Sequence, residues 1–279
     1  MSEKTLGTLY LVATPIGNLS DISLRAIKTL EEVDFIAAED TRVTRKLLAH
    51  LSINKPLVSY HKHNSRVSGE KILARIINGE NCALVTDAGT PAVSDPGQEL
   101  VRLCADEKIP IINIPGPCAA ISALAVSGLN TERFFFEGFL SADKKKRFLH
   151  LDELKTEERT IVFYEAPHKL KRTLEDLLKV FGERRISLSR ELTKIYEETL
   201  RMSLSEAITH FGGNTPRGEF VLVVEGAKCP ADNDDKLDDA VKIAKLFIED
   251  GLSVKDAVKK AADGTGCSRN ALYKIIISG

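Results

Sequence analysis

The sequence contains no tryptophan and few other aromatic residues, which together make up 6% of its 279 residues. Proteins that hold single-stranded nucleic acid often stack its bases on aromatic rings, so this scarcity argues against a large stacking platform. An excess of either charge is also lacking, because 39 basic residues are balanced by 40 acidic ones and the net charge is -1. Any contact with RNA or DNA would therefore need a local basic patch.

Paired cysteines and long apolar runs are missing as well. The five cysteines include no CxxC pair and are odd in number, which indicates reduced thiols in a cytoplasmic protein. No apolar run is long enough to span a bilayer, and residues Met1–Lys4 show no signal-peptide pattern, so we expect neither a membrane partner nor secretion. His61 and His63 lack further ligands at a suitable spacing, and we predict no metal site.

Short apolar runs alternate with amphipathic stretches in the first part of the chain. A helical face is formed by Leu24, Ile27 and Leu30. Strands are predicted at residues 8–13, 33–38, 82–86 and 109–113. Strands alternating with helices predict a mainly parallel sheet that is covered on both faces.

A second set of α/β segments follows Pro117. Strands are predicted at residues 134–136, 160–164, 185–188 and 220–224, and helices at 118–127, 167–180 and 203–211. We therefore expect one α/β domain at 1–117 and a second at 118–227. The polar, acidic segment 228–236 is predicted to be a linker, and 237–279 a small helical domain.

The helical domain has the outline of a helix-turn-helix. The segment 264–266 supplies a turn, and Ser268 is expected to cap the last helix. The residues expected to face inward are Val258, Ala261, Ala262, Leu272, Ile275 and Ile276. A small helical lid or a dimerisation arm would show the same pattern.

Three loops rich in glycine and proline follow predicted strands, at residues 13–18, 86–97 and 114–120. Ligands of open α/β sheets bind at the carboxyl ends of the strands, and glycine lets a ligand approach the backbone. The loops therefore suit a cofactor held by main-chain groups, although glycine and proline also form turns that bind nothing. None has the spacing GxGxxG or GxxxxGK[ST], so NAD, FAD and ATP are not indicated.

Four segments resemble, in this order along the chain, motifs of the tetrapyrrole methylase family in its ribosomal RNA methyltransferase branch. They are Leu11–Asp21, Ala38–Arg42, Asp87–Gly97 and Val162–His168. The resemblance implies two α/β domains of the class III methyltransferase type with a cofactor cleft between them, followed by a C-terminal helix-turn-helix-like domain. It also implies a homodimer that uses S-adenosylmethionine to methylate the ribose 2′-hydroxyl of a cytidine in the decoding region of 16S rRNA. The substrate would be either the free rRNA or the assembled small subunit.

The motif match also places the cofactor contacts of the family on this chain. They fall on Ile16, Gly17, Ala88, Gly89, Thr90, Val93, Cys118, Ala119, Glu165 and Leu192. The porphyrin-modifying branch has a GGD triplet where this chain has Ala-Gly-Thr at 88–90, and its entry loop is richer in glycine. This departure argues against a tetrapyrrole substrate.

A ribose hydroxyl is a poor nucleophile at neutral pH, so a positioned base would accelerate its methylation. Asp40, directly after the second predicted strand, is the first candidate, and Glu39 and His61 are alternatives. Asp40 is equally well placed to cap a helix that begins near Thr41.

Basic residues gather locally despite the neutral total charge. Candidate RNA contacts are Arg42, Arg45 and Lys46 on one helix, Lys144 and Lys145 in a basic run, and Arg190. The run 144–147 is also typical of a solvated helix face, and Arg66 is expected on a loop after His63.

Two other functions stay open. One is a small-molecule methyltransferase on the same fold, which would need neither the basic clusters nor the helical tail. The other is a non-catalytic nucleic-acid-binding regulator whose cleft senses a nucleotide or cofactor.

Overall fold

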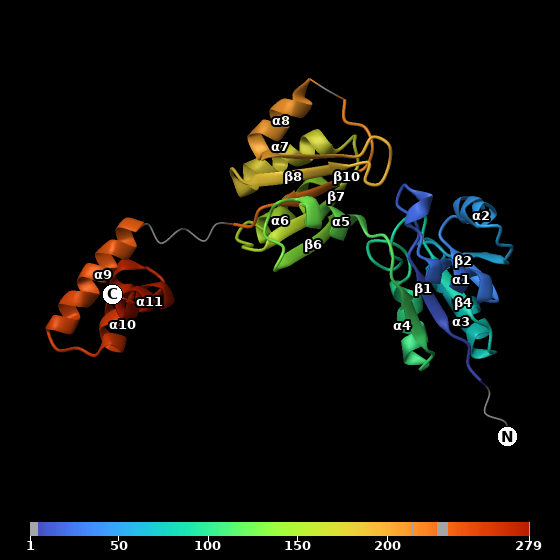
Figure 1. Cartoon of the computed structure of the whole chain (residues 1–279), viewed down its shortest axis with the longest axis horizontal. Helices are drawn as coiled ribbons and strands as arrows, with labels where there is room; N and C mark the ends of the chain where they lie inside the picture. The colour runs from blue at the N-terminus through green and yellow to red at the C-terminus, as the bar shows by residue number, and fades with distance from the viewer. Residues whose placement is uncertain (1–4, 214, 228–233, 279) are drawn as a thin grey trace. The chain divides into compact units, whose positions relative to one another are not determined.

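The computed structural model describes residues 5–213, 215–227 and 234–278. The chain forms two compact units, Met1–Gly226 and Ala227–Gly279. The first unit holds two five-stranded sheets, and the second holds helices (Figure 1).

The first sheet is entirely parallel, as its alternation of strands and helices predicts. Its strands are β1 (Leu9–Val12), β2 (Phe35–Ala38), β3 (Leu57–Ser59), β4 (Cys82–Val85) and β5 (Ile111–Ile114). They are ordered β3-β2-β4-β1-β5, so β4 and β1 lie inside the sheet. The strand β3, the shortest of the five, was not expected from the sequence.

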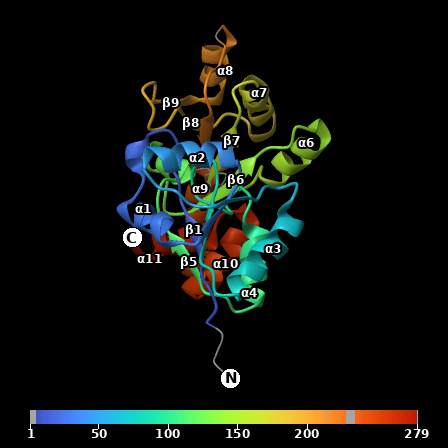
Figure 2. The same cartoon turned by 90° about the vertical axis from the view of Figure 1, so that its right-hand side faces the viewer.

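Helices cover both faces of this sheet. On one face α1 (Leu24–Glu32) and α2 (Thr41–His50) pack on Ala83 and Val85 of β4, among other residues. On the other face α3 (Ser65–Ile77) and α4 (Gln98–Asp106) pack on Cys82 and Leu84. Successive β4 side chains therefore enter opposite cores, as the two-residue repeat of a strand requires. Figure 2 shows α3 and α4 on the side of β1 and β5 that faces away from α1.

The second sheet is mixed. Its strands are β6 (Phe134–Phe139), β7 (Thr160–Glu165), β8 (Arg185–Arg190), β9 (Glu198–Ser203) and β10 (Phe220–Val224), in the order β6-β7-β10-β8-β9. The pair β6–β7 is parallel, and the other three pairs are antiparallel. The edge strand β9 was not expected, because it is mostly polar and contains no run of apolar residues.

The second sheet also has a core on each face. The helix α5 (Ala119–Val126) packs through Ala120, Ala123 and Leu124 on one face. The other face is covered by α6 (Lys144–Glu153), α7 (Leu170–Phe181) and α8 (Leu204–Gly212), and Figure 1 shows α7 and α8 together beside β8.

The structure contradicts two expectations about basic residues. Only the first part of the run 144–147 is solvated, because Arg147 is buried and its Nε atom donates to Oδ2 of Asp176 on α7 at 2.7 Å. Arg66 lies in the first turn of α3 and not on a loop, because the helix begins at Ser65.

The second unit is a three-helix cluster with a core of its own. Its helices are α9 (Asp234–Glu249), α10 (Val254–Thr265) and α11 (Arg269–Ser278), and Ala261 and Leu272 lie in that core. As expected, Ser268 caps the last helix by accepting a hydrogen bond from the N–H of Ala271 at 3.4 Å. Ile275 is 42% exposed, so the expectation that it faces inward is wrong.

The boundaries of this unit also differ in part from the sequence analysis. The helix α9 begins at Asp234, inside the range 228–236 expected to be a linker. Residues 228–233 of that range, with Cys229, lie outside the described residues.

Among the helices that the structure describes, none is sufficiently long and apolar to cross a membrane.

Candidate functional site

A cavity of about 340 Å³ lies within the first unit, at the carboxyl ends of strands from both sheets. The loops after β1, β2, β4, β5 and β8 contribute to its wall, as do the ends of β6 and β7 and the start of β10. Ligands of open α/β sheets bind at such strand ends. The cavity is therefore the candidate functional site.

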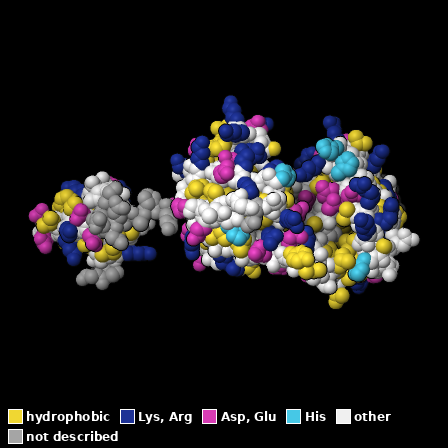
Figure 3. All heavy atoms as spheres, turned by 90° about the horizontal axis from the view of Figure 1, so that it is seen from above, with side chains coloured by type: hydrophobic (Ala, Val, Ile, Leu, Met, Phe, Trp, Pro, Cys, Tyr) yellow, Lys and Arg dark blue, Asp and Glu magenta, His cyan; other side chains and the backbone are white. Residues whose placement is uncertain are grey.

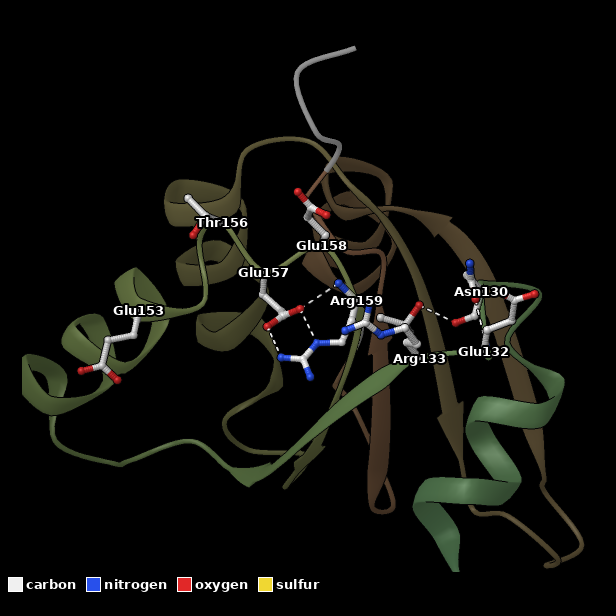
Figure 4. A pocket seen from close by; sticks show the side chains of 9 residues that line it. Asn130, Glu132, Arg133, Glu153, Thr156, Glu157, Glu158 and Arg159 are labelled. Atoms are coloured by element: carbon white, nitrogen blue, oxygen red, sulfur yellow. Dashed lines mark hydrogen bonds and ion pairs between the residues drawn. The ribbon is translucent and has the colours of Figure 1, made fainter. Parts of the chain in front are cut away.

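A larger cavity, of about 540 Å³, lies at the opposite end of β7, near Thr160 (Figure 4). Its wall is polar, and its Arg159 is already bound to Glu157, with 2.6 Å between Nη2 and Oε2. Figure 4 shows Glu153 and Thr156 well apart from this pair, so the side chains do not converge on one point. We assign function to the smaller cavity because the carboxyl ends of the strands and the glycine-rich loops meet there.

The smaller cavity brings together nearly all the residues expected to contact a cofactor. Those on its wall are Ile16, Ala88, Gly89, Thr90, Val93, Cys118, Ala119, Glu165 and Leu192. Gly17 does not line the cavity but lies at the contact between two of its loops. A Cβ atom on Gly17 would be 3.0 Å from the carbonyl oxygen of Leu192 and 2.5 Å from Cγ of Lys194. A side chain at position 17 would therefore push the loops after β1 and β8 apart.

Main-chain groups join the loops that carry these residues. The N–H of Thr14 donates to the carbonyl of Gly89 at 2.9 Å, and the N–H of Gly89 donates back to Thr14 at 3.0 Å. Thr90 Oγ1 donates to the carbonyl of Pro117 at 3.3 Å, so the loops after β1, β4 and β5 form one assembly. Gly89 has a φ of +84°, a conformation that L side chains rarely adopt. The wall here is open backbone, which suits a cofactor held by main-chain donors and acceptors.

Strained backbone is concentrated in two of the cavity loops. Ala92 and Ser94 in the loop after β4, and Glu191 and Thr193 in the loop after β8, all have φ between 50° and 69°. Non-glycine residues keep this conformation only where the surrounding structure imposes it, and such residues cluster at functional sites. Lys62 supports the first of these loops, because its Nζ atom donates to the carbonyl of Ser94 at 3.2 Å.

Carboxyl groups gather on one side of the cavity. Glu39, Asp87 and Asp95 all line it, and burial raises the pKa of each of them. For Asp95 the pKa reaches about 6, because the negative charge of nearby Glu39 adds to the effect of burial. Asp95 was not among the site residues expected from the sequence. Its segment matched a family motif, but a lone aspartate in a loop carries no signal of burial.

The first candidate for a base, Asp40, does not line the cavity. It caps α2, as the alternative interpretation predicts, and its Oδ1 atom accepts from the N–H of Arg42 at 2.8 Å. The hydrogen bonds from Arg42 lower the pKa of Asp40 to about 2. His61 also lies outside the wall, and its buried Nδ1 atom has no hydrogen-bond partner among the residues described.

The candidate RNA contacts differ in their exposure and in whether an acidic side chain already binds them. Arg45 and Lys46 on α2 are exposed, and so are Lys144 and Lys145 on α6. Arg42 is exposed but paired with Asp40, and Arg190 is held by Glu198 with 2.6 Å between Nε and Oε2. Figure 3 shows lysine and arginine side chains in separate groups on the face it presents, with acidic side chains between them.

No group of His, Cys, Asp and Glu side chains suited to a metal ion occurs in the described ranges.

The family model described as "Tetrapyrrole (Corrin/Porphyrin) Methylases" matches residues 8–208, which include the cavity loops after β1, β2, β4, β5 and β8. The chain belongs to the tetrapyrrole methylase family. It is therefore a methyltransferase, and its cofactor is S-adenosylmethionine.

Curated relatives in the tetrapyrrole methylase family match the chain over nearly its whole length. The protein from Synechocystis sp. is 48% identical over 274 residues, covering 97% of each chain. The Bacillus subtilis protein is 45% identical and covers 97% of this chain and 94% of its own. The Escherichia coli O157:H7 protein is also 45% identical and covers 98% and 96%. Each is named ribosomal RNA small subunit methyltransferase I.

Solved structures of tetrapyrrole methylases share the fold. The cobalt precorrin-4 methyltransferase CbiF superposes with a TM-score of 0.57 at 18% identity, covering 77% of this chain and 94% of its own. Uroporphyrin-III C-methyl transferase from Thermus thermophilus, complexed with S-adenyl homocysteine, gives a TM-score of 0.56 at 17% identity, covering 78% and 97%.

Proposed function

We propose that this methyltransferase modifies 16S rRNA and transfers its methyl group to the ribose 2′-hydroxyl of a cytidine in the decoding region. One observation carries the choice of RNA over a small molecule. The two solved tetrapyrrole-modifying enzymes align over at least 94% of their own chains but over only 77–78% of this one. The relatives named for ribosomal RNA align over 97–98% of it. The part of the chain that the small-molecule enzymes lack thus has a counterpart in the ribosomal RNA enzymes. The 2′-hydroxyl and the cytidine follow from the motif resemblance.

The cavity wall would hold S-adenosylmethionine, which supplies an activated methyl group. Its cofactor contacts would be Ile16, Ala88, Gly89, Thr90, Val93, Cys118, Ala119, Glu165 and Leu192, and Gly17 would keep the two loops in contact. The open backbone at Gly89 and the linked loops around it fit this group. Fixed loops that orient both reactants lower the entropic part of the barrier.

Of the three candidate bases, Glu39 has the best position. It lines the cavity, and burial raises its pKa, so it would accept a proton more readily than an ordinary glutamate. Asp40 is bound by Arg42 outside the wall, and we assign it the role of a helix cap. His61 lies outside the wall but close enough for its charge to affect Glu39.

Contact with RNA would come from exposed basic groups. The best placed are Arg45 and Lys46, because α2 begins two residues after Glu39, which lines the cavity. Arg42 could exchange Asp40 for a phosphate, whereas Lys144, Lys145 and the partly exposed Arg190 would add contacts farther along the chain. Contacts of this kind position an RNA without reading its sequence.

A substrate of this kind would place the protein in the cytoplasm, and the homodimer stays a prediction. One surface favours self-association. Ile195 is 94% exposed and Tyr196 is 76% exposed, and both precede the edge strand β9. A second copy of the chain that covered this neighbouring pair would remove its exposed apolar area from water. Sedimentation of the purified chain would show whether it forms a dimer.

The test is methyl transfer with labelled S-adenosylmethionine to free 16S rRNA and to small subunits from cells that lack the protein. We expect label in one cytidine, and mass spectrometry of the nucleosides should place the methyl group on its ribose. Label on a base would contradict the 2′-hydroxyl assignment. Cofactor binding without transfer to either substrate would favour the regulator, and transfer to a small molecule alone would favour the tetrapyrrole-like alternative.

A further inference from the structure

Part of the cavity wall contains none of the residues expected to contact the cofactor. Ser94 and Asp95 come from the loop after β4, and Phe139 ends β6 in the second sheet. The two segments touch, because a Cβ atom on Gly138 would lie 2.8 Å from Oγ of Ser94. Asp95 directly follows Ser94, and Phe139 directly follows Gly138. Both sheets therefore contribute to this part of the wall.

The Asp95 carboxylate is held by its backbone and by no partner group. Ser94 has a φ of 64°, and its carbonyl accepts the hydrogen bond from Lys62 that holds the loop. Asp95 itself makes no hydrogen bond or ion pair with any residue the structure describes. By contrast, Glu39 accepts from the N–H of Asp87 at 3.5 Å, and Asp40 is bound by Arg42. Among the described residues of the wall, Asp95 and Glu219 are the carboxylates without such a partner, and of these two it is Asp95 whose pKa burial raises. Asp95 is therefore free to bind a substrate group.

Phe139 is an unusual residue for a cavity wall because it is 57% exposed. The ring packs on one side against Tyr164, with 5.5 Å between the ring centroids. Tyr164 is fixed in turn, because its hydroxyl accepts from the N–H of Ala120 at 3.2 Å. A supported aromatic ring with an open surface is the usual surface on which an unpaired base stacks. A single ring suits a single nucleotide.

We propose that Asp95 and Phe139 form the acceptor end of the cavity, where an unpaired base stacks on Phe139 and where Asp95, in place of the three bases suggested by the sequence, takes the proton of the attacking hydroxyl. The inference rests on the proposed function. The O–H bond of the acceptor breaks, and its proton goes to a carboxylate oxygen of Asp95. The hydroxyl oxygen forms its new bond to the methyl carbon, and the electrons of the broken carbon–sulfur bond stay on the departing sulfur. Asp95 then releases the proton to water.

The charges around Asp95 favour this role. The negative charges of Glu39, Asp87 and Glu219 raise its pKa, the positive charge of Lys62 lowers it, and the hydroxyl of Tyr164 also lies close enough to interact with it. Burial and Glu39 raise the pKa of Asp95 to about 6, so at pH 7 the group is mostly ionised but more basic than a free aspartate. Because the reactive form is the carboxylate, kcat should rise as the pH increases through about 6 and then level off.

The experiment compares Asp95→Asn with Asp106→Asn in the full chain. Asp106 pairs with Arg102 on the surface of α4, away from the cavity wall. We expect Asp95→Asn to lower kcat by about 10²-fold or more and to remove the rise near pH 6. Affinity for S-adenosylhomocysteine, measured by calorimetry, should stay within about twofold. Asp106→Asn should change neither quantity. In the wild-type protein, carbon NMR of labelled aspartates should show one group that titrates near pH 6 and disappears in Asp95→Asn.

Phe139→Leu tests the stacking surface, with Phe134→Leu in the same strand as its control. We expect Phe139→Leu to raise KM for the RNA about tenfold while kcat changes little, since base stacking contributes mainly to binding. Wild-type kcat in Asp95→Asn, or an unchanged KM in Phe139→Leu, overturns the corresponding half of the proposal while the proposed function stands. If Asp95→Asn loses cofactor affinity or unfolds, the NMR titration decides, and a pKa near 4 for Asp95 overturns the role. A wild-type protein that methylates no RNA overturns both proposals.

Discussion

Arg42 forms an ion pair with Asp40, two residues before it in the sequence, with 2.6 Å between Nη2 and Oδ2. The same carboxylate accepts the backbone N–H of Arg42 and so caps α2. An aspartate engaged in this way is a weak proton acceptor, because its pKa is about 2. The pair therefore fixes the start of the helix that follows Glu39, a residue of the cavity wall.

Asp40→Asn should retain near wild-type kcat, because asparagine also caps helices and the base we propose is Asp95. Asp40→Ala removes the cap and should lower the Tm by about 2–4 °C. Asp143, which caps α6 by accepting from the N–H of Lys146 at 2.9 Å, provides a matched control. Asp143→Ala should lower the Tm by a similar amount. A large loss of kcat in Asp40→Asn at saturating substrate would return Asp40 to the position of first candidate for the base.

The Asp40 cap should also depend on pH. The folded protein holds the pKa of this carboxyl near 2, below its ordinary value of 3.8. The ionised group thus stabilises the fold above about pH 4, and this contribution is lost as the pH falls toward 2. The Tm difference between wild type and Asp40→Asn should therefore shrink between pH 4 and pH 2. A difference that is constant over this range would show that the ion pair does not contribute.

Ala119→Leu should weaken cofactor binding. Ala119 begins α5 and lines the cavity, so a larger side chain there would occupy cofactor space at a cost of about 1–3 kcal/mol. Gly89 is a poorer choice, because its φ of +84° would strain any side chain and confuse binding with folding. Ala49→Leu on the exposed side of α2 is the control. Affinity for S-adenosylhomocysteine is measured by calorimetry. Equal affinity in both variants would show that the cofactor does not bind beside Ala119.

A chain ending at Ala227 should keep cofactor affinity and lose affinity for the ribosomal substrate. The first unit contains the whole cavity, and the helices of the second unit pack on a core of their own. A helix-turn-helix outline favours contact with nucleic acid, and the solved small-molecule enzymes align over only 77–78% of this chain. Filter binding to small subunits would measure the loss. Equal substrate affinity with and without the helical unit would instead favour a lid or a dimerisation arm.

The buried pair Arg147–Asp176 should contribute to stability and not to catalysis. Arg147 also donates to the carbonyls of Ser141 and Ala142 at 3.0 and 3.2 Å, so Arg147→Ala would leave buried groups without partners. We expect a loss of about 3–5 kcal/mol in the free energy of unfolding by urea. Arg102→Ala, at an exposed pair with 3.6 Å between its charged atoms, should cost less than about 1 kcal/mol. Similar losses in both variants would show that burial does not strengthen the first pair.

The sequence predicts most of the fold because apolar runs such as Cys82–Val85 are buried on both faces of a sheet. It misses β3 and β9, because three residues are too few to show a period and an edge strand needs no apolar run. Motif matches predict which loops meet at the cavity. The properties of Asp95 and Arg147 depend on what surrounds them after folding. Nothing in a lone aspartate or a basic run reveals such surroundings.

The contact between Gly17 and the carbonyl of Leu192 has a consequence for synthesis of the chain. The loop that holds Gly17 leaves the ribosome early, but its partner loop is translated on the order of ten seconds later or more. Until then one wall of the cavity does not exist, and the cofactor has no complete site to stabilise. An incomplete nascent chain should therefore gain no protection from the cofactor against proteolysis. That protection begins only when the second sheet has emerged and folded.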